Sequence, residues 1–204
     1  MSMPKIIVPV LVLVLFAATF AMPPSVTPAA RKSPEFLISN PSDPSGKSTL
    51  LSRLKGKVVV LEFFFIQSNH CLRVAQTLNK LNAELAPRGF QAVGIVFDPP
   101  NAKDSGGRLI QPTVDYFKLT YPVGYADKAA VDTYLGRSGK EILSIPQMVV
   151  IDRAGFIRAV TGDRVDPNLE DENSLRTLLD GLLKESPPPA SPAKQPPKSK
   201  KTHH

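Results

Sequence analysis

The sequence predicts an α/β layered fold for residues 34–185. Apolar stretches typical of buried strands alternate along this region with amphipathic stretches typical of helices. The expected strands span residues 58–65, 90–97, 147–151 and 156–161. The expected helices span residues 71–86, 113–119, 128–135 and 172–183, and a short extended segment should run over residues 121–127.

The first strand and the first helix follow from their hydrophobic patterns. Residues 58–65 are apolar except for Glu62, as in a strand that is buried on both faces. The helix after it carries apolar residues at spacings of three and four, including Leu78, and ends before Pro87. The apolar run over residues 90–97 predicts the second strand of the sheet.

The later elements follow from turn and helix-start residues. Pro112 is placed at the start of a helix, where its missing N–H and fixed φ are tolerated. The Asp-Arg-Ala-Gly segment at residues 152–155 separates two apolar runs and predicts a β-hairpin. Acidic residues in the first turn, beginning at Glu172, favour a closing helix.

Both ends differ in composition from the domain. Residues 1–22 combine Lys5, an apolar run and small residues around Ala21, the order found in an export signal. An uncleaved N-terminal membrane anchor is the alternative. We therefore expect an exported chain, periplasmic or otherwise extracytoplasmic, with residues 23–33 as a linker. Residues 186–204 should form a disordered Pro/Lys-rich tail, either a solvated spacer or a basic arm for anionic envelope surfaces.

The formal net charge of +7 belongs mainly to these ends. They carry seven basic residues and no acidic ones, which leaves the domain itself near neutrality. A nucleic-acid-binding domain is therefore not indicated. The chain also shows no ligand cluster or Gly-rich phosphate loop, so we expect neither a metal nor another cofactor.

Four segments resemble thioredoxin-like redoxins of the TlpA type, which are related to the alkyl hydroperoxide reductase and thiol-specific antioxidant (AhpC/TSA) group. These are residues 54–61 (LKGKVVVL), 89–95 (GFQAVGI), 121–127 and 145–155 (IPQMVVIDRAG). The resemblance covers about residues 36–183. It implies a thioredoxin fold, in which a central mixed β-sheet is flanked by helices on both faces and carries a short insertion. It also implies a cis bond between Ile145 and Pro146 beside the active site.

The sequence departs from these redoxins at their Cys-x-x-Cys motif. Residues 68–71 read Ser-Asn-His-Cys, and Cys71 is the only cysteine in the chain. Without a second cysteine the chain cannot form an internal disulfide. Ordinary dithiol exchange is therefore excluded, and the function depends on what one thiol can do.

Three candidate catalytic residues surround this departure. The first turn of a helix favours the thiolate of Cys71, with His70 and Arg73 beside it, although a lone buried cysteine is often a small core residue. Ser68 resembles the Thr/Ser of peroxiredoxins, where the hydroxyl orients a peroxide. Glu62 resembles the buried acid that exchanges a proton with the second cysteine in thioredoxins; alternatively, a lysine such as Lys57 or a water satisfies it.

The expected function is that of a thiol oxidoreductase acting through the single cysteine, with an external thiol as the resolving partner. Protein or small-molecule thiols and disulfides would be its partners, and the residues that contact them would be Asn69, His70, Ile145 and Pro146. Two alternatives remain open at this point. One is a redox-inert protein that binds extended peptides or assists assembly, and the other is a one-cysteine peroxidase that reduces peroxides.

Overall fold

We analysed a computed structural model of the 204-residue chain. The structure describes residues 31–40, 48–98, 106–138, 143–162 and 168–186. The expected export signal or anchor at residues 1–22 and the tail from residue 187 onward lie outside the described residues. None of the helices in the described part of the chain has the length and apolar character that a membrane span requires.

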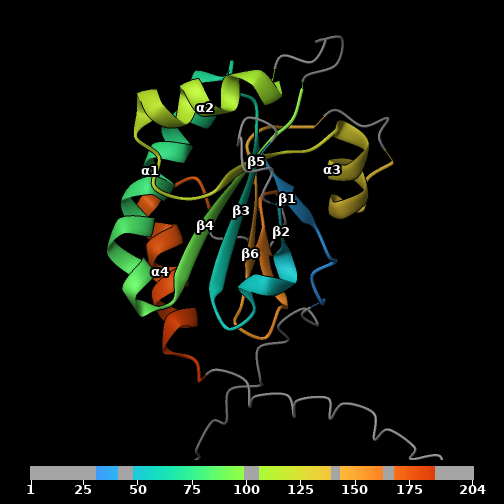
Figure 1. The fold of residues 1–204 in the computed structure, drawn as a ribbon. Coiled ribbons are helices and arrows are strands. Elements are labelled where there is room, and N and C mark those ends of the chain that lie inside the picture. The colour runs from blue at the N-terminus through green and yellow to red at the C-terminus, as the bar shows by residue number, and fades with distance from the viewer. Residues whose placement is uncertain (1–30, 41–47, 99–105, 139–142, 163–167, 187–204) are drawn as a thin grey trace, which may run out of the picture.

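The described residues form an α/β fold around one sheet (Figure 1). The sheet has seven strands in the order β2-β1-β5-β4-β3-β6-β7. The strands are β1 (Leu37–Ser39), β2 (Ser48–Leu50), β3 (Val58–Phe64), β4 (Phe90–Val96), β5 (Val123–Tyr125), β6 (Gln147–Ile151) and β7 (Ile157–Val160). The helices are α1 (Asn69–Leu85), α2 (Gly106–Phe117), α3 (Lys128–Leu135) and α4 (Glu172–Lys184), with short 3-10 turns η1 (Leu51–Leu54) and η2 (Ala86–Arg88).

The central strand β3 fixes the sheet as mixed. It pairs parallel to β4, with Val58 opposite Phe90, and antiparallel to β6, with Glu62 opposite Met148. All seven residues of β3 are buried. The expected mixed sheet is therefore confirmed, as is the reading of this segment as a strand covered on both faces.

Alternate side chains of β3 enter two separate cores. Val58, Val60 and Phe64 pack with α1, α2 and α4, whereas Leu61 and Phe63 pack on the opposite face, which α3 covers. Figure 1 shows α1, α2 and α4 on one side of the sheet and α3 on the other. The alternation follows from the period of two in a strand. Helices on both faces are thus confirmed, and Glu62 lies on the face shared with α1.

Helix α2 differs from the sequence prediction at its start. The prediction placed Pro112 at the beginning of the helix, but α2 begins at Gly106 and contains Pro112 in its interior. Ile110, Val114 and Phe117 recur at helical spacing and pack against the α1 side of the sheet. Burial of this apolar stripe outweighs the one backbone hydrogen bond that proline removes.

We expect Pro112→Ala to stabilise the protein. Pro112 is exposed, so alanine removes no core contact and restores an N–H that can bond to the preceding turn. The gain should be about 1–3 kcal/mol, less than the full helix-interior penalty because proline also restricts the unfolded chain. Guanidinium unfolding measures it. The neighbouring exposed variant Gln111→Ala is the control and should change stability by less than about 0.5 kcal/mol.

Candidate active site

The candidate site lies at the carboxyl end of β3. The chain leaves β3 after Phe64 and enters α1 at Asn69. Strand β6 runs antiparallel to β3 and begins at Gln147, opposite Phe63, so Pro146 lies at the same edge of the sheet. The topology therefore brings together the first turn of α1 and the Ile145-Pro146 segment, which are far apart in sequence.

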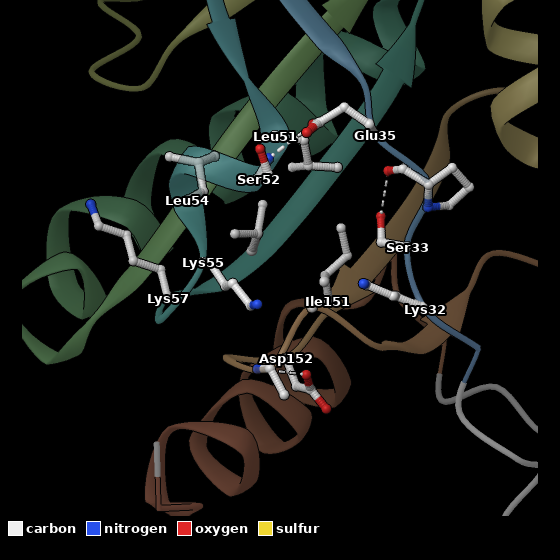
Figure 2. A pocket seen from close by; sticks show the side chains of 14 residues that line it. Lys32, Ser33, Glu35, Leu51, Ser52, Leu54, Lys55, Lys57, Ile151 and Asp152 are labelled. Carbon is white, nitrogen blue, oxygen red and sulfur yellow. Dashed lines mark hydrogen bonds between the residues drawn. The ribbon is translucent and has the colours of Figure 1, made fainter. Parts of the chain in front are cut away.

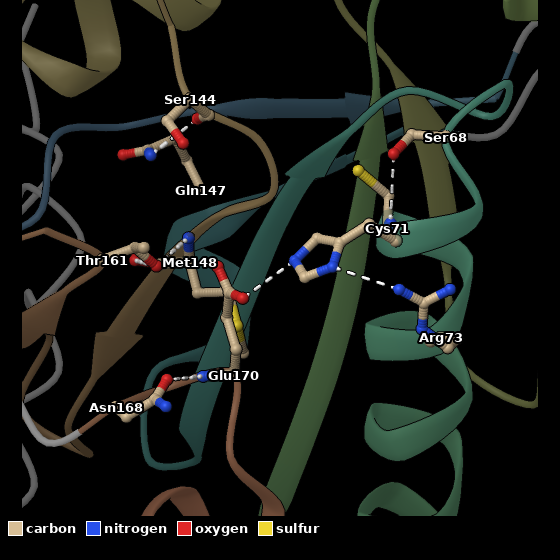
Figure 3. Close-up of polar contacts among 10 residues, drawn as sticks. Ser68, Cys71, Arg73, Ser144, Gln147, Met148, Thr161, Asn168 and Glu170 are labelled. Atoms are coloured by element: carbon tan, nitrogen blue, oxygen red, sulfur yellow. Dashed lines mark hydrogen bonds and ion pairs between the residues drawn. The ribbon is translucent and has the colours of Figure 1, made fainter.

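Ser68 is the N-cap of α1 (Figure 3). Its backbone is extended, and its Oγ accepts a hydrogen bond from the Cys71 N–H at 3.3 Å. This capping bond satisfies one of the free N–H groups of the first helical turn. The sequence prediction gave Ser68 only a catalytic role. A serine just before a helical pattern is itself a cap signature and could have indicated this second role.

Cys71 is fully buried, with an exposed fraction of 0 %. Its side chain belongs to the core between α1 and the sheet, with Val74 and Leu78. Burial raises the pKa of the thiol, and the nearby carboxyl of Glu62 adds to the rise. Hydrogen bonds from Ser68 and from the Phe65 backbone oppose this shift without cancelling it. The backbone N–H of Cys71 in the first turn of α1 does lower the pKa, as the sequence analysis expected, but desolvation outweighs it and the net shift is upward.

Glu62 lies in the middle of β3 and is completely buried. Its cross-strand neighbours are Gly94 on β4 and Met148 on β6. Neither carboxyl oxygen has a hydrogen-bond partner among the described residues, and burial raises the pKa of Glu62 well above its ordinary value. Lys57 does not satisfy it, because the Lys57 ammonium donates to Gln91 at 3.2 Å. The low dielectric around Glu62 thus favours its neutral, protonated form.

Tyr121 is a third ionisable group in this core, and the sequence analysis did not single it out. Its hydroxyl donates to the Ala75 carbonyl of α1 at 3.3 Å. Its ring lies over Gly94, where an added Cβ would approach the ring to 3.4 Å. Burial, and then the charge of Glu62, raises the pKa of Tyr121. Glu62 therefore interacts electrostatically with both Cys71 and Tyr121.

His70 and Asn69 lie on the outer side of the first turn of α1, where both are exposed. The His70 Nε2 lies 2.8 Å from Glu170 Oε2, and its Nδ1 lies 3.4 Å from an Arg73 nitrogen (Figure 3). His70 thus ties the start of α1 to the segment that precedes α4. Glu170 was not predicted, and no local pattern indicates a contact across 100 residues.

The Ile145-Pro146 peptide bond is cis, as the resemblance implied. Pro146 is buried, and Ile145 is half-buried against both cores. The Gln147 side chain donates to the Ser144 carbonyl at 2.7 Å and braces this segment. No cluster of three or more metal-ligating side chains occurs in the described ranges. At this site, too, the described residues form no metal-ligating cluster.

The strand order, the cis-proline segment and the helix that begins at the candidate site define a thioredoxin-like fold. Its residues 29–160 match the model of a family described as the AhpC/TSA family. The chain belongs to this family, since the match covers more than half of it. No curated protein matches the chain.

Several solved structures share the fold. A thiol:disulfide interchange protein of the thioredoxin family from Chlorobium tepidum is 22 % identical, with a TM-score of 0.59 over 76 % of this chain and 97 % of that one. A thiol:disulfide interchange protein from Bacteroides sp. is 20 % identical, with a TM-score of 0.55 over 74 % and 90 %. The thioredoxin domain of a thiol-disulfide oxidoreductase from Bacteroides vulgatus is also 20 % identical, with a TM-score of 0.55 over 74 % and 96 %.

Proposed function

We propose that the chain is an exported thiol oxidoreductase that works through Cys71 alone. The thiolate of Cys71 attacks a disulfide R–S–S–R′, forms the mixed disulfide Cys71–S–S–R and releases R′–S⁻. An external thiolate R″–S⁻ then attacks the R sulfur, forms R–S–S–R″ and releases the thiolate of Cys71. One disulfide is exchanged for another, so the cycle needs no second cysteine and no net oxidant.

The observation that carries this proposal is the position of Cys71. It lies three residues after Ser68, the N-cap of α1, and Glu62 lies on the face of the sheet that α1 covers. The Ser68 hydroxyl accepts a hydrogen bond from the backbone N–H of Cys71, and it lowers the pKa of the Cys71 thiol against the larger effect of burial. We expect a disulfide to reach the sulfur through local opening of this cap. Cys71 gives its proton to solvent before it attacks, because Glu62 is itself protonated. When the Cys71 thiolate is released in the second step, the neutral carboxyl of Glu62 can give it a proton and regain one from solvent.

The residues around the candidate site could bind the part of the partner that flanks its disulfide; we call these residues the rim. Asn69 and His70 are exposed on the first turn of α1, and Ile145 and Pro146 lie at the same edge of the sheet. An extended chain bound along this edge would place its disulfide over the cap at Ser68. A redox-inert peptide-binding protein would use the same rim without needing Cys71, so the thiol itself has to be tested.

The test uses the full chain in its reduced form and glutathione disulfide as the probe. We expect one glutathione adduct per folded chain by mass spectrometry, located at Cys71, absent in Cys71→Ser and reversed by excess thiol. The adduct should form faster than global unfolding, as measured by amide exchange under the same conditions. If the adduct formed only at the rate of global unfolding, Cys71 would be an inert core residue.

Export is tested separately by cell fractionation. Recovery of the chain only in the cytoplasmic fraction would contradict export.

The rate of the glutathione reaction should depend on pH in a defined direction. Burial raises the pKa of Cys71, so less thiolate is present near neutral pH than in a free cysteine. We expect the rate constant to keep rising above about pH 10, where a free thiol with a pKa of about 8.5 has levelled off. Stopped-flow measurements with the folded chain and with free cysteine as a control check this. A plateau near pH 8 or below would contradict the burial argument.

A further inference from the structure

A pocket lies at the opposite end of β3 from Cys71 (Figure 2). It has a volume of about 410 Å³, within the usual range for small-molecule sites. Leu51, Leu54, Val59 and Ile151 supply apolar walls. The pocket is therefore large enough and apolar enough to bury the body of a small organic molecule.

This pocket is separate from the candidate active site. Val59 is the second residue of β3, and Ile151, opposite it, is the last residue of β6. Cys71 follows the other end of β3. A seven-residue strand is roughly 20 Å long, so the two sites lie about that far apart. A ligand in the pocket would not touch Cys71, so the inference does not depend on the proposed thiol chemistry.

Two lysines at the pocket, Lys32 and Lys55, have no ion-pair partner among the acids of the described residues. Figure 2 shows the ammonium groups of Lys32 and Lys55 extending toward each other from opposite walls. Neither ammonium has a hydrogen-bond or ion-pair partner within the described part of the chain. The third lysine, Lys57, is already bound to the side chain of Gln91.

The two acids at the pocket already accept hydrogen bonds from the chain. An oxygen of Glu35 accepts from the backbone N–H groups of Phe36 and Ser52. Asp152 accepts from two backbone N–H groups of its own turn and from Arg158. Three lysines against two acids still leave the pocket lining with a net charge of +1. The ammonium groups of Lys32 and Lys55, which have no partner in the described ranges, therefore favour an anionic ligand group.

We propose that this pocket binds an organic anion that carries a carboxylate on an apolar body. The body would lie against Leu54 and Ile151, and the carboxylate would bind between Lys32 and Lys55. Such a group can come from a free alkanoate or from the C-terminus of a peptide that ends in an apolar residue. A fully polar anion such as inorganic phosphate would leave the apolar walls uncovered and bind less well.

The test titrates the full chain with sodium octanoate and, separately, with N-acetyl-leucyl-leucine, and follows amide signals by NMR. We expect saturable shifts at Val59, Ile151 and Gly155, with none at Cys71. Lys55→Gln and Lys32→Gln should each weaken binding by about tenfold or more, because each removes a charged hydrogen-bond donor. The probe that binds more tightly identifies the source of the carboxylate.

The controls separate charge from apolar contact. Octan-1-ol has the same chain without the charge and should bind at least about tenfold more weakly than octanoate. Lys118→Gln removes an exposed lysine at the end of α2 and should leave the titration unchanged. Equal binding of octanol and octanoate, or full binding by the Lys32→Gln/Lys55→Gln double variant, would overturn the proposal. These results do not depend on Cys71, so the thiol proposal can fail or succeed separately.

Discussion

Replacing Ser68 with cysteine should convert the chain into a dithiol oxidoreductase. Ser68 already holds the N-cap position, and its Oγ lies within hydrogen-bonding reach of Cys71. Residues three apart at the start of a helix are close enough for a disulfide. A thiol at position 68 would also be partly exposed, unlike that of Cys71. It could attack a substrate disulfide, and Cys71 could then resolve the mixed disulfide from within the chain.

We expect reduction of insulin disulfides by Ser68→Cys at a rate at least about 100-fold above that of the unmodified chain, with dithiothreitol as reductant. The gain comes from replacing an encounter with an external thiol by an intramolecular step. Mass spectrometry should also show an internal disulfide between positions 68 and 71 after oxidation. Adding Cys71→Ser to Ser68→Cys should remove both properties.

Gln67→Cys is a matched control. It places an exposed thiol one residue earlier, outside the cap position, and should form mixed disulfides that Cys71 resolves slowly. If Gln67→Cys and Ser68→Cys were equally active, the geometry of the cap would not matter. If Ser68→Cys were folded but inactive, Cys71 would be too enclosed to react, and the proposed single-thiol function would fail with it.

The sequence predicts most of the fold because the main elements carry local patterns. Helix α3 has the expected bounds, and β3, β4, β6 and α4 match within a residue of each predicted end. Strands β1 and β2 were not predicted, because three residues are too few to show an alternating pattern. The start of α2 was misplaced because proline was read as a helix start, whereas tertiary packing of the apolar stripe decides.

The candidate site was predicted only where its residues stand out locally. Cys71 and Ser68 follow from their position after an apolar strand, and Glu62 from being the one charge inside that strand. Tyr121 reaches the site through a contact with Ala75 across 46 residues, which no local pattern indicates. The direction of the pKa shift at Cys71 also escaped prediction, because desolvation depends on how completely the folded core encloses the sulfur.

Removing the carboxyl of Glu62 should stabilise the protein, most strongly in alkaline solution. Burial raises the pKa of Glu62 above its value of about 4.3 in the unfolded chain. Between these two pKa values the unfolded state gives up its proton while the native state retains it. The free energy of unfolding therefore falls as pH rises through this range, by up to about 1.4 kcal/mol per pH unit.

Glu62→Gln should abolish this part of the pH dependence, and Glu62→Leu should also remove two buried oxygens that lack partners. We expect Glu62→Leu to raise the free energy of unfolding near pH 8 by about 1–3 kcal/mol, and by less near pH 4. Guanidinium unfolding at several pH values measures it. Glu84→Gln, which alters an exposed ion pair with Arg176, should change stability by less than about 1 kcal/mol at any of them.

The same variants separate a functional Glu62 from one that only destabilises the core. Above its own raised pKa, Glu62 is ionised and its charge adds to the pKa of Cys71, so Glu62→Gln should shift the alkaline part of the glutathione pH profile toward lower pH. Below that pKa, Glu62→Gln should slow the resolving step, because the protonated carboxyl that gives a proton to the Cys71 sulfur is gone. A variant that is more stable yet has an unchanged pH profile and resolving rate would show that Glu62 takes no part in the chemistry of Cys71.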